Sequence, residues 1–111
     1  MKWRVISVHD VQDFIETLPE DGQHKVQWVE ERLEELGLDI ARTDWAKHVE
    51  GDLWELRVQW RRLFIRLFYY RSGDREFTIV GACKKKSNKT PRREKEIALE
   101  TMRRLKKQLR H

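Results

Sequence analysis

The sequence predicts an α+β fold, with a small antiparallel sheet, two N-terminal helices on one face and a basic C-terminal helix. Residues 54 to 60 alternate apolar and polar side chains, as a strand with one buried face does. Residues 63 to 70 are almost continuously apolar and predict a central strand. Helical spacing of apolar residues precedes and follows these runs. A chain of 111 residues with 39% hydrophobic content predicts a single domain, residues 1–111.

The N-terminal quarter predicts a strand followed by a short helix. Residues 3 to 8 alternate and predict an opening strand. Apolar residues at helical spacing predict a helix over residues 11–18, with Asp10 as its N-cap. Pro19 should end that helix.

A second, longer helix should begin at Glu20 and end at Gly37, a residue type that favours a C-cap. Glutamates on its outer face predict a solvated surface. Residues 38 to 47 show no clear period and predict a loop in which Trp45 packs on the core. The apolar stripe of the second helix consists of Val26, Val29, Leu33 and Leu36.

Three central strands are expected to pair in sequence order. Only Arg61 and Arg62 separate the first two, which predicts a two-residue hairpin. The resulting register places Arg57 opposite Arg66, and like charges in that position are unfavourable by up to roughly 1 kcal/mol. After a turn at residues 72–74, residues 77 to 83 predict the third strand.

The alternation assigns the side chains of these strands to two faces. One face is predicted to be the core, and the other, which carries Arg57, Arg66 and Lys85, is predicted to be open to a ligand. The core face collects Trp54, Leu56, Val58, Trp60, Leu63, Ile65, Leu67, Tyr69, Val80 and Ala82. The arginine face also collects Phe64, Phe68, Phe77, Ile79, Gly81 and Cys83, with Gly81 leaving room for a close approach.

Three clustered cations suit a phosphodiester, because Arg offers a planar fork of donors and Lys a movable point charge. Glu55 lies two residues from Arg57 on the same predicted face. It therefore offers an alternative, in which it pairs with one or both arginines and the patch is an ion network on the surface. The residues alone leave both interpretations open.

The last quarter of the chain is strongly basic. Residues 84–111 hold 12 Lys/Arg and 3 Asp/Glu, whereas the rest holds 12 and 16. Such an end is typical of a nucleic-acid binder, and it also suits an acidic protein partner. After the basic loop, Thr90 is the expected cap of a helix that starts at Pro91. Its apolar stripe would consist of Ala98, Met102, Leu105 and Leu109.

Several function classes lack their signatures. One cysteine cannot form an internal disulfide, and four scattered histidines predict no metal site. There is no Gly-rich phosphate loop and no Gly-x-Ser-x-Gly elbow. Without a long apolar run or a signal-peptide core, no membrane association is expected and the protein should be cytoplasmic.

Three motifs carry a resemblance to a known family. They are Glu55-Leu-Arg57, the Arg66 inside Phe-Ile-Arg-Leu-Phe-Tyr, and Lys85-Lys-Ser-Asn-Lys-Thr-Pro91. In this order, over roughly residues 49–98, they resemble the HigB-like, phage-derived branch of the RelE superfamily of toxins. That branch usually has an aromatic residue two positions before the lysine pair, where this chain has Cys83. This departure leaves the phosphate-binding cations untouched.

The resemblance implies a RelE-like fold and a type II toxin that cuts mRNA in the ribosomal A site, with no metal and no cofactor. Its partners would be mRNA, the ribosome with its rRNA, and a helix-turn-helix antitoxin. It further implies that Arg57 and Arg66 clamp the phosphate and that Lys85 and Lys86 lie nearest the reacting groups. RNA would be bound by Lys84, Lys89, Arg92, Arg93 and Tyr70, whose ring could stack a base.

Two alternatives remain open at the level of the sequence. The first is a toxin that binds without catalysis, either to gyrase or to a nucleic acid. The second is an inactive prophage remnant. The lysine pair with two strand arginines favours the RNA-cutting toxin, because a gyrase-binding protein does not need that set.

Overall fold

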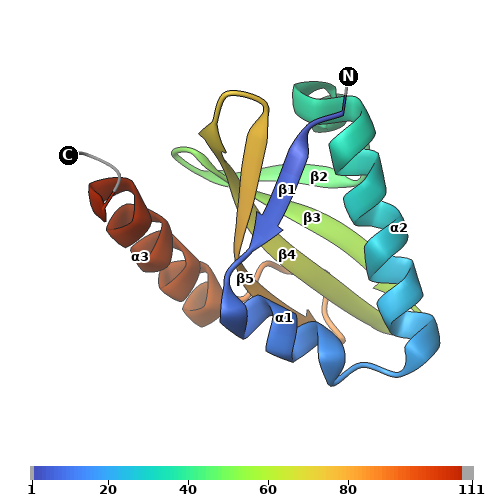
Figure 1. The fold of residues 1–111 in the computed structure, drawn as a ribbon. Helices are drawn as coiled ribbons and strands as arrows, with labels where there is room; N and C mark the ends of the chain where they lie inside the picture. The colour runs from blue at the N-terminus through green and yellow to red at the C-terminus, as the bar shows by residue number, and fades with distance from the viewer. Residues whose placement is uncertain (1, 109–111) are drawn as a thin grey trace.

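The structure, a computed structural model, describes residues 2–108, within which one five-stranded sheet is flanked by three α-helices (Figure 1). A short 3-10 helix, η1, links the second helix to the sheet. The elements in chain order are β1 (Arg4–Ser7), α1 (His9–Glu16), α2 (Glu20–Leu36), η1 (Gly37–Arg42), β2 (Ala46–Glu50), β3 (Leu53–Trp60), β4 (Leu63–Gly73), β5 (Glu76–Lys85) and α3 (Arg92–Gln108).

The strands lie in the order β1-β5-β4-β3-β2. The predicted α+β class is confirmed, and β2 to β5 form the expected antiparallel sheet. β1 differs, because it pairs with β5 in parallel. The chain passes from β1 through α1 and α2 to β2 at the opposite edge of the sheet, and β5 returns to lie beside β1. None of the helices within residues 2–108 is long and apolar enough to cross a membrane.

The predicted hairpin between β3 and β4 is confirmed, with Arg57 directly opposite Arg66. Arg61 takes the left-handed backbone conformation that its tight turn needs, with φ 57°. The next turn falls slightly later than predicted, because β4 continues to Gly73 and β5 begins at Glu76.

A β-bulge in β5 changes the predicted assignment of faces. Phe68 pairs with Gly81 and Tyr69 pairs with Ile79, so Val80 is the extra residue. The alternation therefore shifts by one position at the bulge. Phe77 and Ile79 lie on the predicted core face, and Val80 lies on the arginine face, opposite to the predictions for all three.

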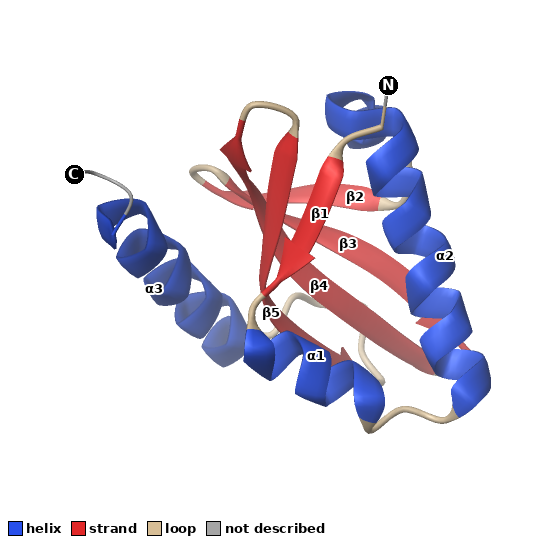
Figure 2. Cartoon of the chain, in the orientation of Figure 1, coloured by secondary structure: helices blue, strands red, loops and turns tan. Residues whose placement is uncertain are grey.

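The sheet separates two hydrophobic clusters. The helices that flank the sheet are seen in Figure 2. The larger cluster joins α1 and α2 to the sheet through residues such as Val11, Val29 and Leu67. The smaller one joins α3 to the other face through Phe68 and Leu99. The arginine face is therefore covered by a helix in its middle, which leaves only its margins for a ligand.

Helix ends follow the predictions in part. Gly37 ends α2 with φ 57°, as predicted. Asp10 is not a cap, because α1 begins at His9, two residues before the predicted start, and Val8 is its N-cap. Leu36, predicted as core, is 37% exposed. The aperiodic segment after α2 contains η1, and it runs into the short edge strand β2, which the sequence did not reveal.

The basic helix α3 follows the predicted stripe for three of four positions. Ala98 and Met102 are buried and Leu105 is half-buried, whereas Leu109 lies outside the described residues. The hydroxyl of Thr90 binds Glu55 of β3. That bond ties the preceding loop to the sheet, a role that its assignment as a helix cap did not anticipate.

Candidate functional site

A cavity of about 380 Å³ lies where β2 stops short of the end of β3. β2 pairs only with Leu53–Leu56, so the rest of β3, from Arg57 on, runs past it. Side chains from five parts of the chain meet there: α2, the segment before β2, β3, β4 and the loop before α3. Those with polar or aromatic groups are Lys25, Asp44, Trp45, Arg57, Gln59, Phe64, Arg66 and Asn88.

Arg57 is the accessible arginine of the cavity. Its backbone N–H donates to the carbonyl oxygen of Trp45 at 2.7 Å, which fixes the strand at this point. Its guanidinium donates to Oδ1 of Asn88 at 2.6 Å. Within residues 2–108 it has no carboxylate partner. Most of its donors therefore remain available to an anion.

Arg66, opposite Arg57, is 1% exposed and pairs with Glu55, which is fully buried, at 3.4 Å. This buried carboxylate offsets the repulsion between the two arginines. Arg66 also donates to the carbonyl oxygen of Ser87 at 3.3 Å, whereas its Nε is buried without a partner. Removing one member of such a pair typically costs about 3–5 kcal/mol, because the other charge stays buried.

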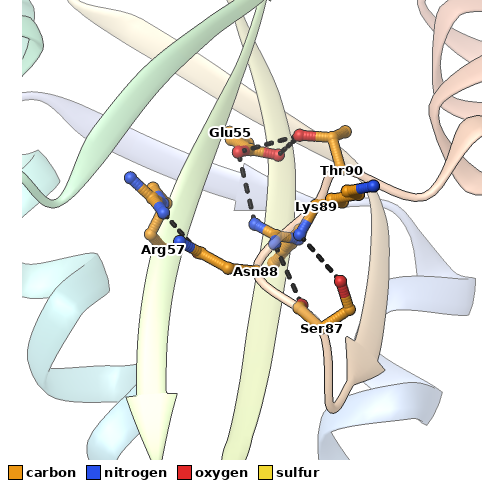
Figure 3. A network of polar contacts seen from close by, with 7 residues as sticks. Glu55, Arg57, Ser87, Asn88, Lys89 and Thr90 are labelled. Atoms are coloured by element: carbon orange, nitrogen blue, oxygen red, sulfur yellow. Dashed lines mark hydrogen bonds and ion pairs between the residues drawn. The ribbon is translucent and has the colours of Figure 1, made fainter.

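Three contacts hold the basic loop over the sheet (Figure 3). The hydroxyl of Thr90 donates to both oxygens of Glu55, at 3.1 and 3.2 Å. Arg57 binds the side chain of Asn88, and Arg66 binds the backbone of Ser87. The loop that carries the predicted lysines is therefore fixed at the rim of the cavity.

The structure brings together two of the four residues that the resemblance assigns to catalysis. Arg57 and Arg66 line the cavity, whereas Lys85 and Lys86 do not. Lys85 pairs with Glu94 of α3 at 3.3 Å. Lys86 is exposed and makes no ion pair with any residue from 2 to 108. The outcome is mixed: the arginine pair converges, and the lysines lie beside the cavity.

The predicted RNA-binding residues divide into exposed cations and one buried ring. All four cations are exposed: Lys84 near the end of β5, Lys89 on the loop, and Arg92 and Arg93 in the first turn of α3. Arg92 pairs with Glu96 at 3.3 Å. Tyr70 is only 2% exposed, because α3 covers it. Its ring therefore has no free face on which a base could stack.

The prediction that the arginine face is open to a ligand is wrong at its centre. A Cβ atom on Gly81 would lie 3.2 Å from the Cβ of Ala98, so the space at Gly81 is filled by α3. The alternative, in which Glu55 pairs with an arginine, holds for Arg66. The pair is buried, however, and does not form a surface network. What stays open is the end of the sheet at Arg57.

Cys83 lies on the arginine face, as predicted, directly opposite Arg66, and is buried beneath α3. Burial, and then the charge of Glu94, raises the pKa of its thiol to about 11. At neutral pH it is therefore a packed thiol and not a nucleophile. Within residues 2–108 no three His, Cys, Asp or Glu side chains lie close enough to hold a metal ion.

Sequence patterns did not place Lys25, Asp44 or Asn88 in the site, and they assigned Trp45 to packing alone. Lys25 lies on α2, and Asp44 and Trp45 precede β2, so only the fold brings them to Arg57. The one available signal was the aperiodic segment before β2, because irregular segments next to a rigid sheet often carry function.

A comparison with protein-family models identifies the family. The model for "Phage derived protein Gp49-like (DUF891)" matches residues 13–103. The chain belongs to this Gp49-like family. The matched range includes every residue of the cavity, from Lys25 to Asn88. No curated protein matches the chain.

The Gp49-like chain also resembles a solved structure. A chain of the crystal structure of the archaeal RelE–RelB complex from Pyrococcus horikoshii OT3 superposes with a TM-score of 0.59 at 20% sequence identity. The match covers 80% of this chain and 100% of that one. The predicted phage-derived family is confirmed by the family model, and the predicted RelE-like fold is confirmed by this likeness.

Proposed function

We propose that this Gp49-like protein is the toxin of a type II toxin–antitoxin pair and an mRNA endoribonuclease that acts at the ribosome. One observation carries the proposal. Arg57 and Arg66 converge on one cavity, at whose rim the lysine-rich loop is fixed by Asn88 and Ser87. That arrangement offers positive charge to one phosphate and further cations to the flanking RNA.

The proposed reaction uses the RNA itself as the nucleophile. The 2′-hydroxyl attacks the adjacent phosphorus and gives up its proton. The bond to the 5′-oxygen then breaks, and that oxygen receives a proton, which leaves a 2′,3′-cyclic phosphate and a 5′-hydroxyl. The protein has to stabilise the added negative charge and move two protons.

Arg57, with free donors facing the cavity, is proposed to contact the phosphate. Arg66 would add positive potential from the opposite strand and hold the loop in place. Lys85 and Lys86 are proposed to serve the proton transfers. RNA on either side of the cut would be held by Lys84, Lys89, Arg92 and Arg93.

We further propose that an antitoxin neutralises the protein. The solved chain that it resembles comes from a complex of RelE with RelB. A helix-turn-helix antitoxin encoded beside this chain would fit the same pattern. The toxin would act in the cytoplasm, where the ribosome and its mRNA are found.

A second candidate function is a toxin that binds RNA without cutting it. Two of the four proposed catalytic cations already have carboxylate partners, Arg66 with Glu55 and Lys85 with Glu94. An ion pair weakens the attraction of a cation for a further anion. Under this second proposal the cavity would bind RNA and block translation without breaking the chain.

The two candidates are separated by mRNA cleavage in a translation extract. The purified wild type should stop translation and leave cut mRNA. Arg57→Ala changes a half-buried side chain without a carboxylate partner among residues 2–108, and Lys86→Ala changes an exposed one, so both should keep the wild-type circular dichroism spectrum. Removal of one charge-stabilising donor typically costs about 100-fold to 1,000-fold in rate, and a loss of that order is expected for Arg57→Ala.

Arg42→Ala is the matched control, because Arg42 is an exposed arginine on η1 that does not line the cavity. It should cut at the wild-type rate. Wild-type cutting by Arg57→Ala would contradict the proposed role of the cavity. Translation arrest with intact mRNA would select the second candidate.

A further inference from the structure

We propose that the outer part of the cavity binds the base of the nucleotide whose phosphate lies on Arg57, and that Asp44 and Lys25 select guanine there. The inference rests on the proposed function and adds a base-recognition subsite to it. It uses residues on the α2 side of the cavity, none of which the motifs of the sequence include.

Trp45 supplies an aromatic wall next to the phosphate position. It is half-buried, lines the cavity and accepts a hydrogen bond from the backbone of Arg57 at 2.7 Å. The ring of Trp28 packs edge-on against it, with centroids 5.5 Å apart and an interplanar angle of 77°. A held aromatic ring beside an arginine is the usual support for a base stacked next to its own phosphate.

Asp44 supplies hydrogen-bond acceptors at the same wall. It is exposed, lines the cavity and makes no hydrogen bond or ion pair with any residue from 2 to 108. A lone carboxylate would repel a phosphate. Its presence beside two arginines therefore suits a ligand group that donates hydrogen bonds to it. The pairing edge of a base can donate in this way.

Lys25 completes the set with a donor. Its ammonium lies 5.5 Å from the centre of the Trp28 ring, and the same side chain lines the cavity. The pairing edge of guanine presents one acceptor, O6, followed by two adjacent donors, N1–H and N2–H₂. Adenine, cytosine and uracil each lack two adjacent donors. A carboxylate beside an ammonium therefore matches guanine better than the other RNA bases.

Two further features show that the cavity has room and unmet bonding capacity. Its volume of about 380 Å³ lies within the usual range for small-ligand sites, roughly 300–1,000 Å³. Arg66 lines the cavity, and its Nε atom is buried without a hydrogen-bond partner. Buried donors of this kind are rare unless a ligand or water completes them.

The test measures binding of the four 5′-mononucleotides to the purified full chain by calorimetry. GMP should bind the wild type more tightly than AMP, CMP or UMP. Asp44→Asn should raise the Kd for GMP about tenfold and leave the Kd for UMP unchanged, because a good two-bond contact to a base is worth about that factor. Lys25→Gln should weaken GMP binding as well.

Asp39→Asn is the matched control, since Asp39 is another exposed aspartate nearby that does not line the cavity. It should leave all four Kd values unchanged. The inference is overturned if the wild type does not distinguish the four nucleotides, which includes binding none of them. It is also overturned if Asp44→Asn behaves like Asp39→Asn.

Mapping of cut sites separates this inference from the proposed function. Asp44→Asn should still cut RNA, with a weaker preference for guanine at the cut, whereas Arg57→Ala should cut about 100-fold to 1,000-fold more slowly. Unchanged cut sites in Asp44→Asn would reject the base subsite and leave the nuclease standing. A wild type that prefers GMP but cuts no RNA would reject the nuclease and support the base subsite.

Discussion

Glu30 shows how one side chain can make stability depend on pH. It lies in a recess with Val5, Gln27 and Glu34, between α2 and β1. Burial, and then the charge of Glu34, raises the pKa of Glu30 from 4.5 to about 7. The folded state therefore keeps this proton at pH values where the unfolded chain has lost it. The resulting stability is fully present below about pH 4.5 and is lost as the pH rises to about 7.

Glu30→Gln should remove this pH dependence, because glutamine stays neutral. At pH 8 the variant should be more stable than the wild type by about 1–3 kcal/mol, since each unit of pKa shift corresponds to about 1.4 kcal/mol. At pH 4 the two proteins should differ little. Urea unfolding at several pH values measures this, with the exposed Glu31→Gln as control. Equal stabilities at pH 8 would show that Glu30 is well solvated.

The buried Glu55–Arg66 pair shows what the sequence could predict at the level of single residues. Alternation and the short hairpin were enough to place Arg57 opposite Arg66 and to identify Glu55 as a partner for either. Which arginine pairs with Glu55 depends on two residues of the later loop. Ser87 binds Arg66 from 21 residues away, and Thr90 binds Glu55 from 35 residues away. No local pattern encodes that approach.

At the scale of elements, the contact between β5 and α3 depends on two small residues. Ala98 packs against Gly81, where an added Cβ atom would lie 3.2 Å from the Ala98 Cβ and 3.4 Å from the ring of Phe68. This close approach brings Leu99 and Met102 of α3 into the smaller hydrophobic cluster. The small size of Gly81 and Ala98 thus determines how close α3, and the loop before it, lie to the sheet.

The double-mutant cycle of Gly81→Ala with Ala98→Gly should reveal this contact. Gly81→Ala alone gains strand propensity but crowds α3, whereas Ala98→Gly alone costs about 1 kcal/mol of helix propensity. In the Ala98→Gly background the crowding is relieved. Gly81→Ala should then be more favourable there by at least about 0.5 kcal/mol, measured by urea unfolding. If the changes in unfolding free energy of the two single variants simply add, α3 moves to accommodate the new methyl group and the contact is not tight.

Elements whose apolar residues follow a regular spacing could be predicted from the sequence. Features that arise only from pairing with another strand could not. The hairpin of β3 and β4, the C-cap of α2 and the stripe of α3 follow from local spacing. The bulge at Val80 does not, because an extra residue appears only when β5 is paired with β4. β2 was missed for the same reason, since five residues at a sheet edge carry too little alternation. The cavity beside β2 was consequently hidden as well.

At the scale of the whole molecule, the basic charge is divided into paired and free cations. Acidic residues of the β2–β3 hairpin neutralise part of α3, because Glu50 pairs with Lys95 and Arg103, and Asp52 pairs with Lys106. Other cations of the basic C-terminal part make no ion pair within the described residues. Between residues 84 and 108 they are Lys84, Lys86, Lys89, Arg93, Arg104 and Lys107.

The salt dependence of RNA binding should distinguish these two groups. Each phosphate contact to single-stranded RNA contributes about 0.7 to the slope of log affinity against log salt concentration. Lys86→Gln should lower the magnitude of this slope by about that amount. Lys106→Gln removes a cation that already has a carboxylate partner and should change it little. Identical slopes for both variants, from fluorescence anisotropy at several salt concentrations, would contradict the division.

The parallel pairing of β1 with β5 also affects how the protein is made. Arg4 pairs with Glu76, so β1 can complete its hydrogen-bonded pairing only after a strand about 70 residues later has been translated. At about 5–20 residues per second that wait lasts several seconds. Asn88, at the rim of the cavity, emerges later still. A nascent chain therefore cannot complete its sheet before Lys85, or its cavity before Asn88, has been synthesised.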